Sequence, residues 1–325
     1  MRALIHSTFG APEEVLHIED RPLPEPGEGQ VRLRVALSPI HNHDLWTVRG
    51  TYGFTPELPA PSGTEAVGVV DALGSGVENL AVGQRVATGG TFGAWAEYIV
   101  ANAAGLIPVP ETLPDETAAQ LVSMPFSTIT LLDFLDVQEG DWIVQNAANG
   151  AVGRMLAQLG AARGVNVVGL VRRTAGIEEL REQSIDRIVA TDQEDWREQV
   201  AALTEGAPVV AGVDSVGGAA AGQVLSLLAE GGTLVAFGAM DSPTMEIASS
   251  DVIFKQATVK GFWGSKVIPQ LDPATRRALF GELFERLSDG SLTLPVGGIF
   301  DAAEISEAVQ ASNTPGRVGK VLLRF

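Results

Sequence analysis

The segment from residue 141 to residue 173 constrains the fold of this chain more than any other stretch. It opens with an apolar strand at residues 142–146, passes through a short turn and enters a helix whose apolar residues recur every three or four positions. A second apolar strand follows at residues 165–171. This strand–helix–strand order indicates a βαβ unit, whose first turn lets backbone N–H groups approach a pyrophosphate. The sequence therefore predicts a dinucleotide site.

The residues expected to contact the pyrophosphate are Asn149, Gly150, Ala151 and Val152, followed by Gly153. This run matches only part of the G-x-G-x-x-G pattern, and a loose glycine match is weak evidence by itself. An ordinary tight turn of an α/β protein is the alternative interpretation. The residues that follow the second strand favour the cofactor interpretation.

The second strand ends at Val171 and is followed directly by Arg172 and Arg173. Folds that bind NAD usually carry an acid at this place, where it holds the ribose 2′-hydroxyl. A guanidinium instead suits the 2′-phosphate of NADPH, which a carboxylate would repel. We therefore predict that NADPH is the cofactor. The alternative for the two arginines is a solvated strand end.

Composition narrows the classes of partner. The formal net charge of −18 disfavours nucleic acid and anionic lipid, so an anionic cofactor needs local basic groups. The absence of cysteine excludes disulfides, thiolate catalysis and cysteine–zinc sites. The first residues show no signal or transit pattern, and no stretch approaches the roughly 20 apolar residues of a membrane helix. We expect a cytoplasmic protein with no membrane or nucleic-acid partner.

The 325 residues suggest two domains. Residues 1–117 form short strands separated by Gly and Pro, which predicts a compact, barrel-like β domain. Six parallel strands alternate with helices in the following domain, at residues 118–263, and this predicts a complete doubly wound Rossmann sheet. Residues 264–325 include a helix at 273–287 and a closing strand at 317–324, and are expected to rejoin the first domain.

Two histidines and an acid, His41, His43 and Asp44, fall within four residues. A metal site is one interpretation. The other is a polar loop and helix start, in which the histidines are hydrogen-bonded or solvated. We favour the second, because no cysteine is available as a further ligand and we expect the side chains of His41 and His43 to point in different directions.

Tyr52 lies in the loop Gly50-Thr51-Tyr52-Gly53 and is one of only two tyrosines. Its hydroxyl is a proton donor at neutral pH, which suits the protonation of an enolate. An exposed loop tyrosine is the alternative.

Several segments together resemble the medium-chain dehydrogenase/reductase superfamily, and they span nearly the whole chain. They lie at residues 38–68, 144–153, 214–218, 237–240, 253–263 and 319–323. Thr64 stands where zinc-dependent members carry histidine, so the chain resembles the zinc-free members. Among these it is most similar to the mitochondrial-type 2-enoyl thioester (trans-2-enoyl-CoA/ACP) reductases, through its GTYG and KGFW segments. Its other segments are shared with quinone oxidoreductases.

This resemblance implies a six-stranded Rossmann sheet inserted into a mainly β, GroES-like domain. It also implies NADPH-dependent reduction of a carbon–carbon double bond in an enoyl thioester, with Tyr52 as the proton donor and no metal. The further residues it assigns to cofactor or substrate are Phe237, Gly238, Ala239, Met240, Phe262, Trp263 and Lys320. By composition alone, Trp263 is instead a core residue and Lys320 a surface lysine.

The chain departs from the family pattern at His41, Met124, Arg173 and Thr174, which puts the substrate in doubt more than the cofactor. The alternatives are an NADPH:quinone or enone oxidoreductase and a non-catalytic NADPH-binding protein. The superfamily often dimerises through the edge of the cofactor-domain sheet, so we expect a homodimer in which residues 257–263 take part.

Overall fold

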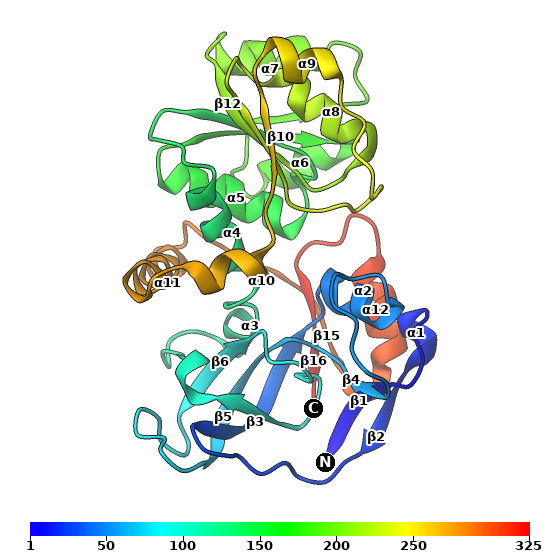
Figure 1. Ribbon diagram of the computed structural model, residues 1–325, viewed down its shortest axis with the longest axis vertical. Coiled ribbons are helices and arrows are strands. Elements are labelled where there is room, and N and C mark those ends of the chain that lie inside the picture. The colour runs from blue at the N-terminus through cyan, green and yellow to red at the C-terminus, as the bar shows by residue number, and fades with distance from the viewer. The chain divides into compact units, whose positions relative to one another are not determined.

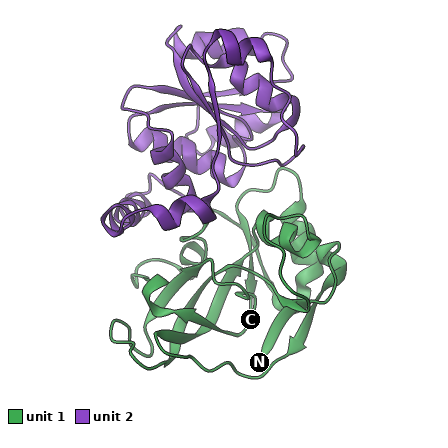
Figure 2. Cartoon of the chain, viewed as in Figure 1, with its two compact units in different colours: residues 1–124, 294–325 green, residues 125–293 purple.

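The computed structural model describes all 325 residues, which divide into two compact units (Figure 2). Unit 1 consists of Met1–Met124 and Leu294–Phe325, and unit 2 consists of Pro125–Thr293. The second unit is therefore inserted into the first. No helix is long and apolar enough to cross a membrane.

The unit boundaries differ from those drawn from the sequence at residues 117/118 and 263/264. Residues 264–293 belong to unit 2 because helix α11 (Pro273–Ser288) packs within it. Phe280 of this helix stacks on Phe126, with 4.0 Å between the ring centroids. Glu282 pairs with Arg163 at 2.8 Å. No periodicity in the sequence reveals which core a terminal helix will join.

Unit 2 contains the predicted sheet of six parallel strands (Figure 1). Its strand order is β11-β10-β9-β12-β13-β14, the order of a doubly wound dinucleotide fold. The bounds are β9 Trp142–Gln145, β10 Asn166–Val171, β11 Ile188–Ala190, β12 Val209–Asp214, β13 Thr233–Ala236 and β14 Thr258–Gly261. The order reverses between β9 and β12, where ligands collect at the carboxyl ends of the strands.

Helices connect these strands. The helix of the βαβ unit is α5 (Ala151–Ala162), and it buries Met155, Leu156 and Leu159, which confirms the predicted apolar face. The other helices are α4 Met124–Phe134, α6 Ala175–Arg181, α7 Trp196–Thr204, α8 Gly218–Leu227, α9 Ser249–Phe254 and α10 Gly264–Val267.

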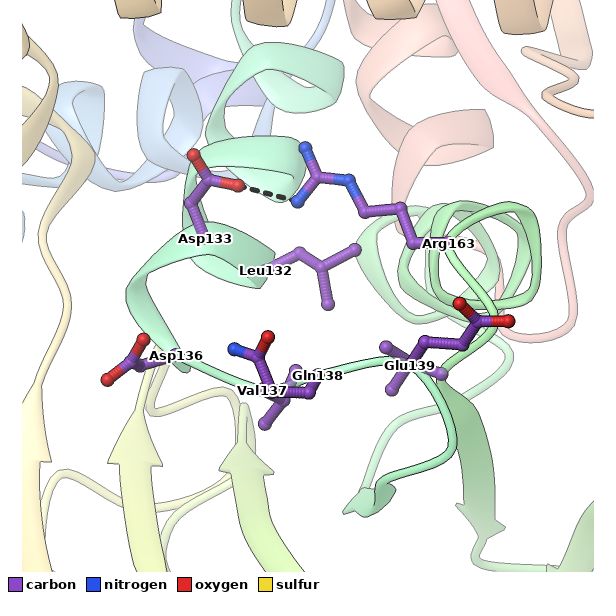
Figure 3. A pocket seen from close by; sticks show the side chains of 8 residues that line it. Leu132, Asp133, Asp136, Val137, Gln138, Glu139 and Arg163 are labelled. Carbon is purple, nitrogen blue, oxygen red and sulfur yellow. Dashed lines mark hydrogen bonds and ion pairs between the residues drawn. The ribbon is translucent and has the colours of Figure 1, made fainter.

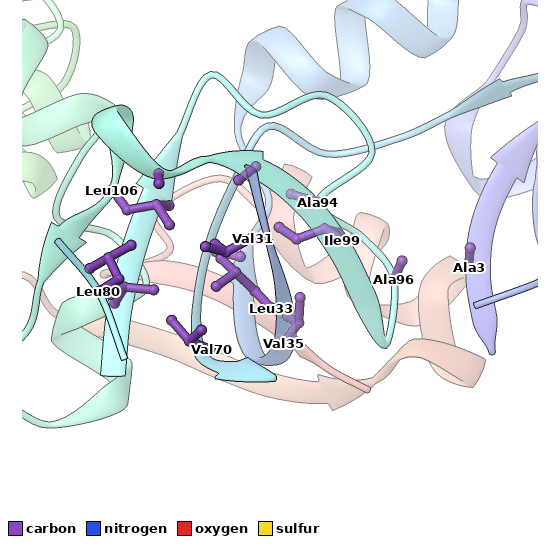
Figure 4. Packing of buried hydrophobic residues seen from close by; sticks show 14 of the residues in the cluster. Ala3, Val31, Leu33, Val35, Val70, Leu80, Ala94, Ala96, Ile99 and Leu106 are labelled. Carbon is purple, nitrogen blue, oxygen red and sulfur yellow. The ribbon is translucent and has the colours of Figure 1, made fainter. Parts of the chain in front are cut away.

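Unit 1 is mainly β and holds two sheets. The smaller has the order β2-β1-β4 and the larger the order β15-β16-β3-β5-β6-β8, with β7 also paired to β3. Val31, Leu33 and Val35 alternate along β3 and point into one apolar core with Val70 and Ile99 (Figure 4). The bounds are β1 Arg2–His6, β2 Leu16–Asp20, β3 Gln30–Pro39, β4 Ala60–Pro61, β5 Glu65–Leu73, β6 Arg85–Gly89, β7 Tyr98–Asn102 and β8 Ile107–Pro108.

The end of the chain completes unit 1, as predicted. Strand β15 (Val296–Asp301) leads into α12 (Ile305–Asn313), and β16 (Lys320–Arg324) then pairs antiparallel with β3. In that register Leu323 lies opposite Ser38. The last strand therefore lies next to the segment that carries His41 and His43.

Candidate cofactor and proton-transfer site

The turn after β9 presents an open helix end. Asn149, Gly150 and Ala151 are exposed, and Gly150 is the N-cap of α5 without any side-chain cap. The first N–H groups of a helix lack partners within it and carry partial positive charge. A Cβ atom on Gly153 would lie 2.7 Å from the Ala147 carbonyl oxygen, so only glycine lets the helix approach the turn this closely. These features suit a bound phosphate.

Arg154, a residue that sequence reasoning missed, braces this turn. Its Nε donates to the Asn149 carbonyl oxygen at 3.0 Å, and its Nη2 donates to Glu179 of α6 at 2.5 Å. The side chain is 6% exposed. The sequence gave little indication of this role, because an arginine next to Met155 is typical of the solvent-exposed edge of a helix with one buried face.

Arg172 and Arg173 follow the end of β10, and both are exposed. Neither forms an ion pair with a carboxylate, whereas the next residue, Thr174, donates through its hydroxyl to Asp192 at 3.1 Å. A Cβ atom on Gly176 would lie 3.7 Å from Nδ2 of Asn149, so the arginine segment borders the open turn. Two uncompensated guanidinium groups therefore stand near the expected pyrophosphate.

Asp214 and Asn146 join the two central strands where the strand order reverses. Oδ1 of the fully buried Asp214 accepts from Asn146 Nδ2 at 2.5 Å and from the Gly217 N–H at 3.1 Å. The Ser215 N–H donates to Asn146 Oδ1 at 2.7 Å. Asp214 thus fixes the backbone of the turn that leads into α8. Asn146, which holds Asp214 and the Ser215 N–H, was not identified from the sequence.

The loop Phe237-Gly238-Ala239-Met240 leaves the carboxyl end of β13. The N–H groups of Phe237 and Gly238 donate to the Asp214 carbonyl oxygen at 2.7 and 3.2 Å. Met240 is 53% exposed. The loop therefore lies at the sheet edge where a dinucleotide fold binds its ligand.

Phe262 and Trp263 follow β14 and have different surroundings. Phe262 is buried, with ring centroids 5.8 Å from Phe237 and 5.3 Å from Phe134. Trp263 is 40% exposed, so the alternative that it belongs to the core is wrong. Phe262 supports the loop from beneath, and the Trp263 ring is accessible.

A second group of candidate side chains lies in unit 1, at the start of α2 (Asn42–Arg49). His41 is the N-cap residue, and its N–H donates to Asp44 Oδ2 at 3.0 Å. The rings of His41 and His43 stack, with centroids 4.9 Å apart. The expectation that they point in different directions is wrong, since the two rings stack at the start of α2.

Both histidines are hydrogen-bonded, as favoured above. His41 Nε2 lies 2.6 Å from Glu65 Oε2, and His43 Nε2 lies 2.7 Å from Thr64 Oγ1. The Thr64 hydroxyl in turn donates to Asp44 Oδ1 at 2.8 Å. No group of three or more His, Asp or Glu side chains is arranged to hold a metal ion.

Glu65 is fully buried, and its other oxygen, Oε1, accepts from the N–H groups of Val122 and Ser123 at 2.6 and 2.7 Å. Burial raises the pKa of Glu65 to about 7, although these bonds oppose the shift. Burial likewise lowers the pKa of His41 well below its ordinary value. At neutral pH His41 is therefore a neutral imidazole, and its Nε2 shares a hydrogen bond with the Glu65 carboxyl group.

Lys320 opens β16 and is 9% exposed, so the alternative of a plain surface lysine is wrong. Burial lowers its pKa to about 8, while the carboxylates of Asp44 and Glu65 partly offset this. Contact between Lys320 and the cofactor stays a prediction.

Comparison with known proteins agrees with this geometry. Residues 27–111 match the family described as alcohol dehydrogenase GroES-like domain, and residues 151–279 match the zinc-binding dehydrogenase family. The mitochondrial enoyl-acyl-carrier-protein reductase of Homo sapiens is 32% identical over 333 residues, which cover 99% of this chain and 88% of that protein. The chain belongs to the medium-chain dehydrogenase/reductase superfamily. It is an NAD(P)-dependent oxidoreductase with a GroES-like mainly β domain and a Rossmann domain.

Solved structures of the superfamily show the same fold. A mycobacterial protein in complex with NADPH has a TM-score of 0.88 at 27% identity, with 100% of both chains covered. A quinone oxidoreductase from Pseudomonas syringae has a TM-score of 0.87 at 26% identity, with 100% of this chain and 99% of that chain covered.

A cavity of about 380 Å³ lies elsewhere in the Rossmann domain (Figure 3). Its lining precedes the amino ends of β9 and β10, at the sheet edge opposite the open turn. Asp133, Asp136 and Glu139 line it, and its one cation, Arg163, is already paired with Asp133 at 2.5 Å. An anionic cofactor would be repelled there.

The buried carboxyl of Glu65 leads to a pH-dependent stability. Its folded pKa of about 7 lies above the ordinary value of 4.5, so its stabilising contribution is present below pH 4.5 and is lost as the pH rises through 7. We expect the free energy of unfolding of the wild type, relative to Glu65→Gln, to fall by about 3 kcal/mol over that window. Urea unfolding at a series of pH values measures this difference.

The control is Glu78→Gln, which changes an exposed glutamate of the same domain. Its pH profile should parallel that of the wild type. Parallel profiles for Glu65→Gln and the wild type would show that Glu65 titrates as an ordinary carboxyl.

Proposed function

We propose that this oxidoreductase uses NADPH to reduce the carbon–carbon double bond of a 2-enoyl thioester. The observation that carries the proposal is the place of Tyr52. This half-buried tyrosine lies in the loop after α2, with its ring centroid 5.8 Å from that of His43. The similarity to the human enoyl reductase, which extends over 99% of this chain, supports the same reaction.

NADPH is proposed as the cofactor because Arg172 and Arg173 are exposed without carboxylate partners. Their guanidinium groups would hold the 2′-phosphate, and the backbone of Asn149, Gly150, Ala151 and Val152 would hold the pyrophosphate. The mycobacterial structure in complex with NADPH supports this choice. When bound, the cofactor supplies a hydride.

The chain's own residues then handle the proton. Hydride addition to the β-carbon leaves the electron pair of the double bond on the α-carbon and carbonyl oxygen as an enolate. The O–H bond of Tyr52 breaks, and its proton forms the new C–H bond at the α-carbon, directly or through one water. The protein thereby positions the two reactants and limits the access of solvent.

The remaining assignments extend this site. We propose that the loop Phe237-Gly238-Ala239-Met240 covers the nicotinamide half of the cofactor. Phe262 supports that loop, the Trp263 ring faces the ligands, and Lys320 acts on the cofactor from β16.

We also propose a homodimer. Strand β14 is the last strand of its sheet, and Phe254 beside it is 79% exposed, with Ile253 at 57% and Val259 at 39%. Pairing of two such edges would cover this apolar surface. A cytoplasmic location and the absence of nucleic-acid partners stay predictions from composition.

A substrate panel tests the proposed function. NADPH oxidation is followed with crotonyl-CoA, longer 2-enoyl-CoA esters, small enones and quinones as acceptors. We expect the enoyl thioesters to give the highest kcat/KM. Preference for quinones would favour the alternative supported by the fold of the Pseudomonas syringae quinone oxidoreductase. Binding of NADPH without oxidation by any acceptor would indicate a non-catalytic protein.

A further inference from the structure

A hydrogen-bonded chain leads from a buried carboxylate to the ring of His43. Asp44 is 2% exposed, and its Oδ1 accepts from the Thr64 hydroxyl at 2.8 Å. The Thr64 oxygen lies 2.7 Å from His43 Nε2. The His43 ring then faces Tyr52. The chain thus ends at the proposed proton donor.

The direction of these hydrogen bonds sets the state of the imidazole. Thr64 has one hydroxyl proton, and it is donated to Asp44. The Thr64 oxygen can therefore only accept from His43, so Nε2 of His43 carries a proton. The other ring nitrogen of His43 is Nδ1, and an imidazole can accept or donate a proton at either nitrogen. The Asp44 Oδ1 atom lies 3.5 Å from Nε2.

We propose that His43 is a positioning residue that returns a proton to Tyr52 after each turnover. The inference rests on the proposed function, because it requires Tyr52 to lose its proton to the substrate. The N–H bond at Nδ1 breaks, and its proton restores the phenol O–H, directly or through one water. The side chain of His43 is 19% exposed, so solvent supplies the replacement proton.

The charges around His43 suit this role. The titratable groups next to His43 are His41, Asp44 and Tyr52. Glu65 and Lys320 interact electrostatically with this group of residues. His41 is neutral and stacks on His43, so it does not repel a protonated ring.

The test uses His43→Gln in the full-length protein. A glutamine amide can still donate to Thr64 but cannot carry a proton between solvent and Tyr52. The first turnover consumes the proton already on Tyr52, so one equivalent of NADPH per site should be oxidised at the wild-type rate. Later turnovers should be slower by about 100-fold, the lower range for a positioned proton donor. Stopped-flow absorbance with crotonyl-CoA resolves the two phases.

If His43→Gln does not fold, a pair of variants at Thr64 tests the same proposal. Thr64→Val removes the oxygen that orients His43, and Thr64→Ser keeps it, so later turnovers should be slower in Thr64→Val than in Thr64→Ser. His17→Gln is the matched control, because this exposed histidine pairs with Glu19 away from the chain described here. It should behave as the wild type.

Three outcomes separate a failure of the relay from a failure of the proposed function. Equal slowing of first and later turnovers in His43→Gln, or no slowing in either, would overturn the relay while the proposed function stands. A wild type that oxidises NADPH with no enoyl thioester would overturn the proposed function and the relay with it.

Discussion

Replacing Tyr52 by phenylalanine is expected to lower kcat for a 2-enoyl thioester by roughly 100- to 10,000-fold, the range of a positioned general acid. The ring and its contact with His43 are retained, so the Kd for NADPH should change little. The physical reason is that only the hydroxyl supplies a proton to the α-carbon. Steady-state NADPH oxidation and a binding titration measure the two quantities.

The chain provides a matched control for this change. Tyr98, on β7, is the only other tyrosine, and Tyr98→Phe should keep the wild-type kcat. If Tyr52→Phe also retained wild-type turnover, then the α-carbon would receive its proton from another group or from water. The tyrosine assignment would then be wrong, although the cofactor assignment would survive.

Changing both Arg172 and Arg173 to serine is expected to weaken NADPH binding roughly 100-fold or more, because charge-assisted hydrogen bonds contribute about 1.5–3 kcal/mol each. NADH lacks the 2′-phosphate, so its Kd should stay within about threefold of the wild-type value. The ratio of the two dissociation constants, measured by fluorescence titration, reports the change. The loss of NADPH affinity caused by the double substitution should also be smaller at high salt, where salt already screens the contacts of the two arginines in the wild type.

Arg181→Ser is the matched control, since this exposed arginine on α6 already pairs with Glu178 at 2.9 Å. It should leave both dissociation constants unchanged. An unchanged preference for NADPH in the double variant would show that the two guanidinium groups do not meet the 2′-phosphate. The choice of cofactor would then depend on other residues.

Much of the fold could be predicted because its signals are local. Apolar runs predicted all six strands of the Rossmann sheet, and the spacing of Met155, Leu156 and Leu159 predicted the buried face of α5. The return of the last strand to the first domain also followed from the sequence. The assignment of α11 to unit 2 did not, because it depends on contacts such as Phe280 with Phe126.

The candidate site was predictable only in part. The open turn and the two arginines belong to one continuous segment, so their order along the chain already placed them near each other. Arg154 was missed because its partners lie in the turn before α5 and in α6, and its burial follows from those contacts. The direction of His43 was mistaken because residues two apart share one face even in an extended segment, and at the start of α2 the rings of His41 and His43 stack.

By itself, the sequence determined the βαβ unit, the charge next to it and the absence of cysteine ligands, because each is a property of neighbouring residues or of composition. Only the tertiary structure decided the protonation chemistry in the GroES-like domain. His41 and Glu65 are 24 residues apart, and Glu65 and Ser123 are 58 apart. A pKa responds to burial and to the groups within a few ångströms, and both arise only when distant segments pack together.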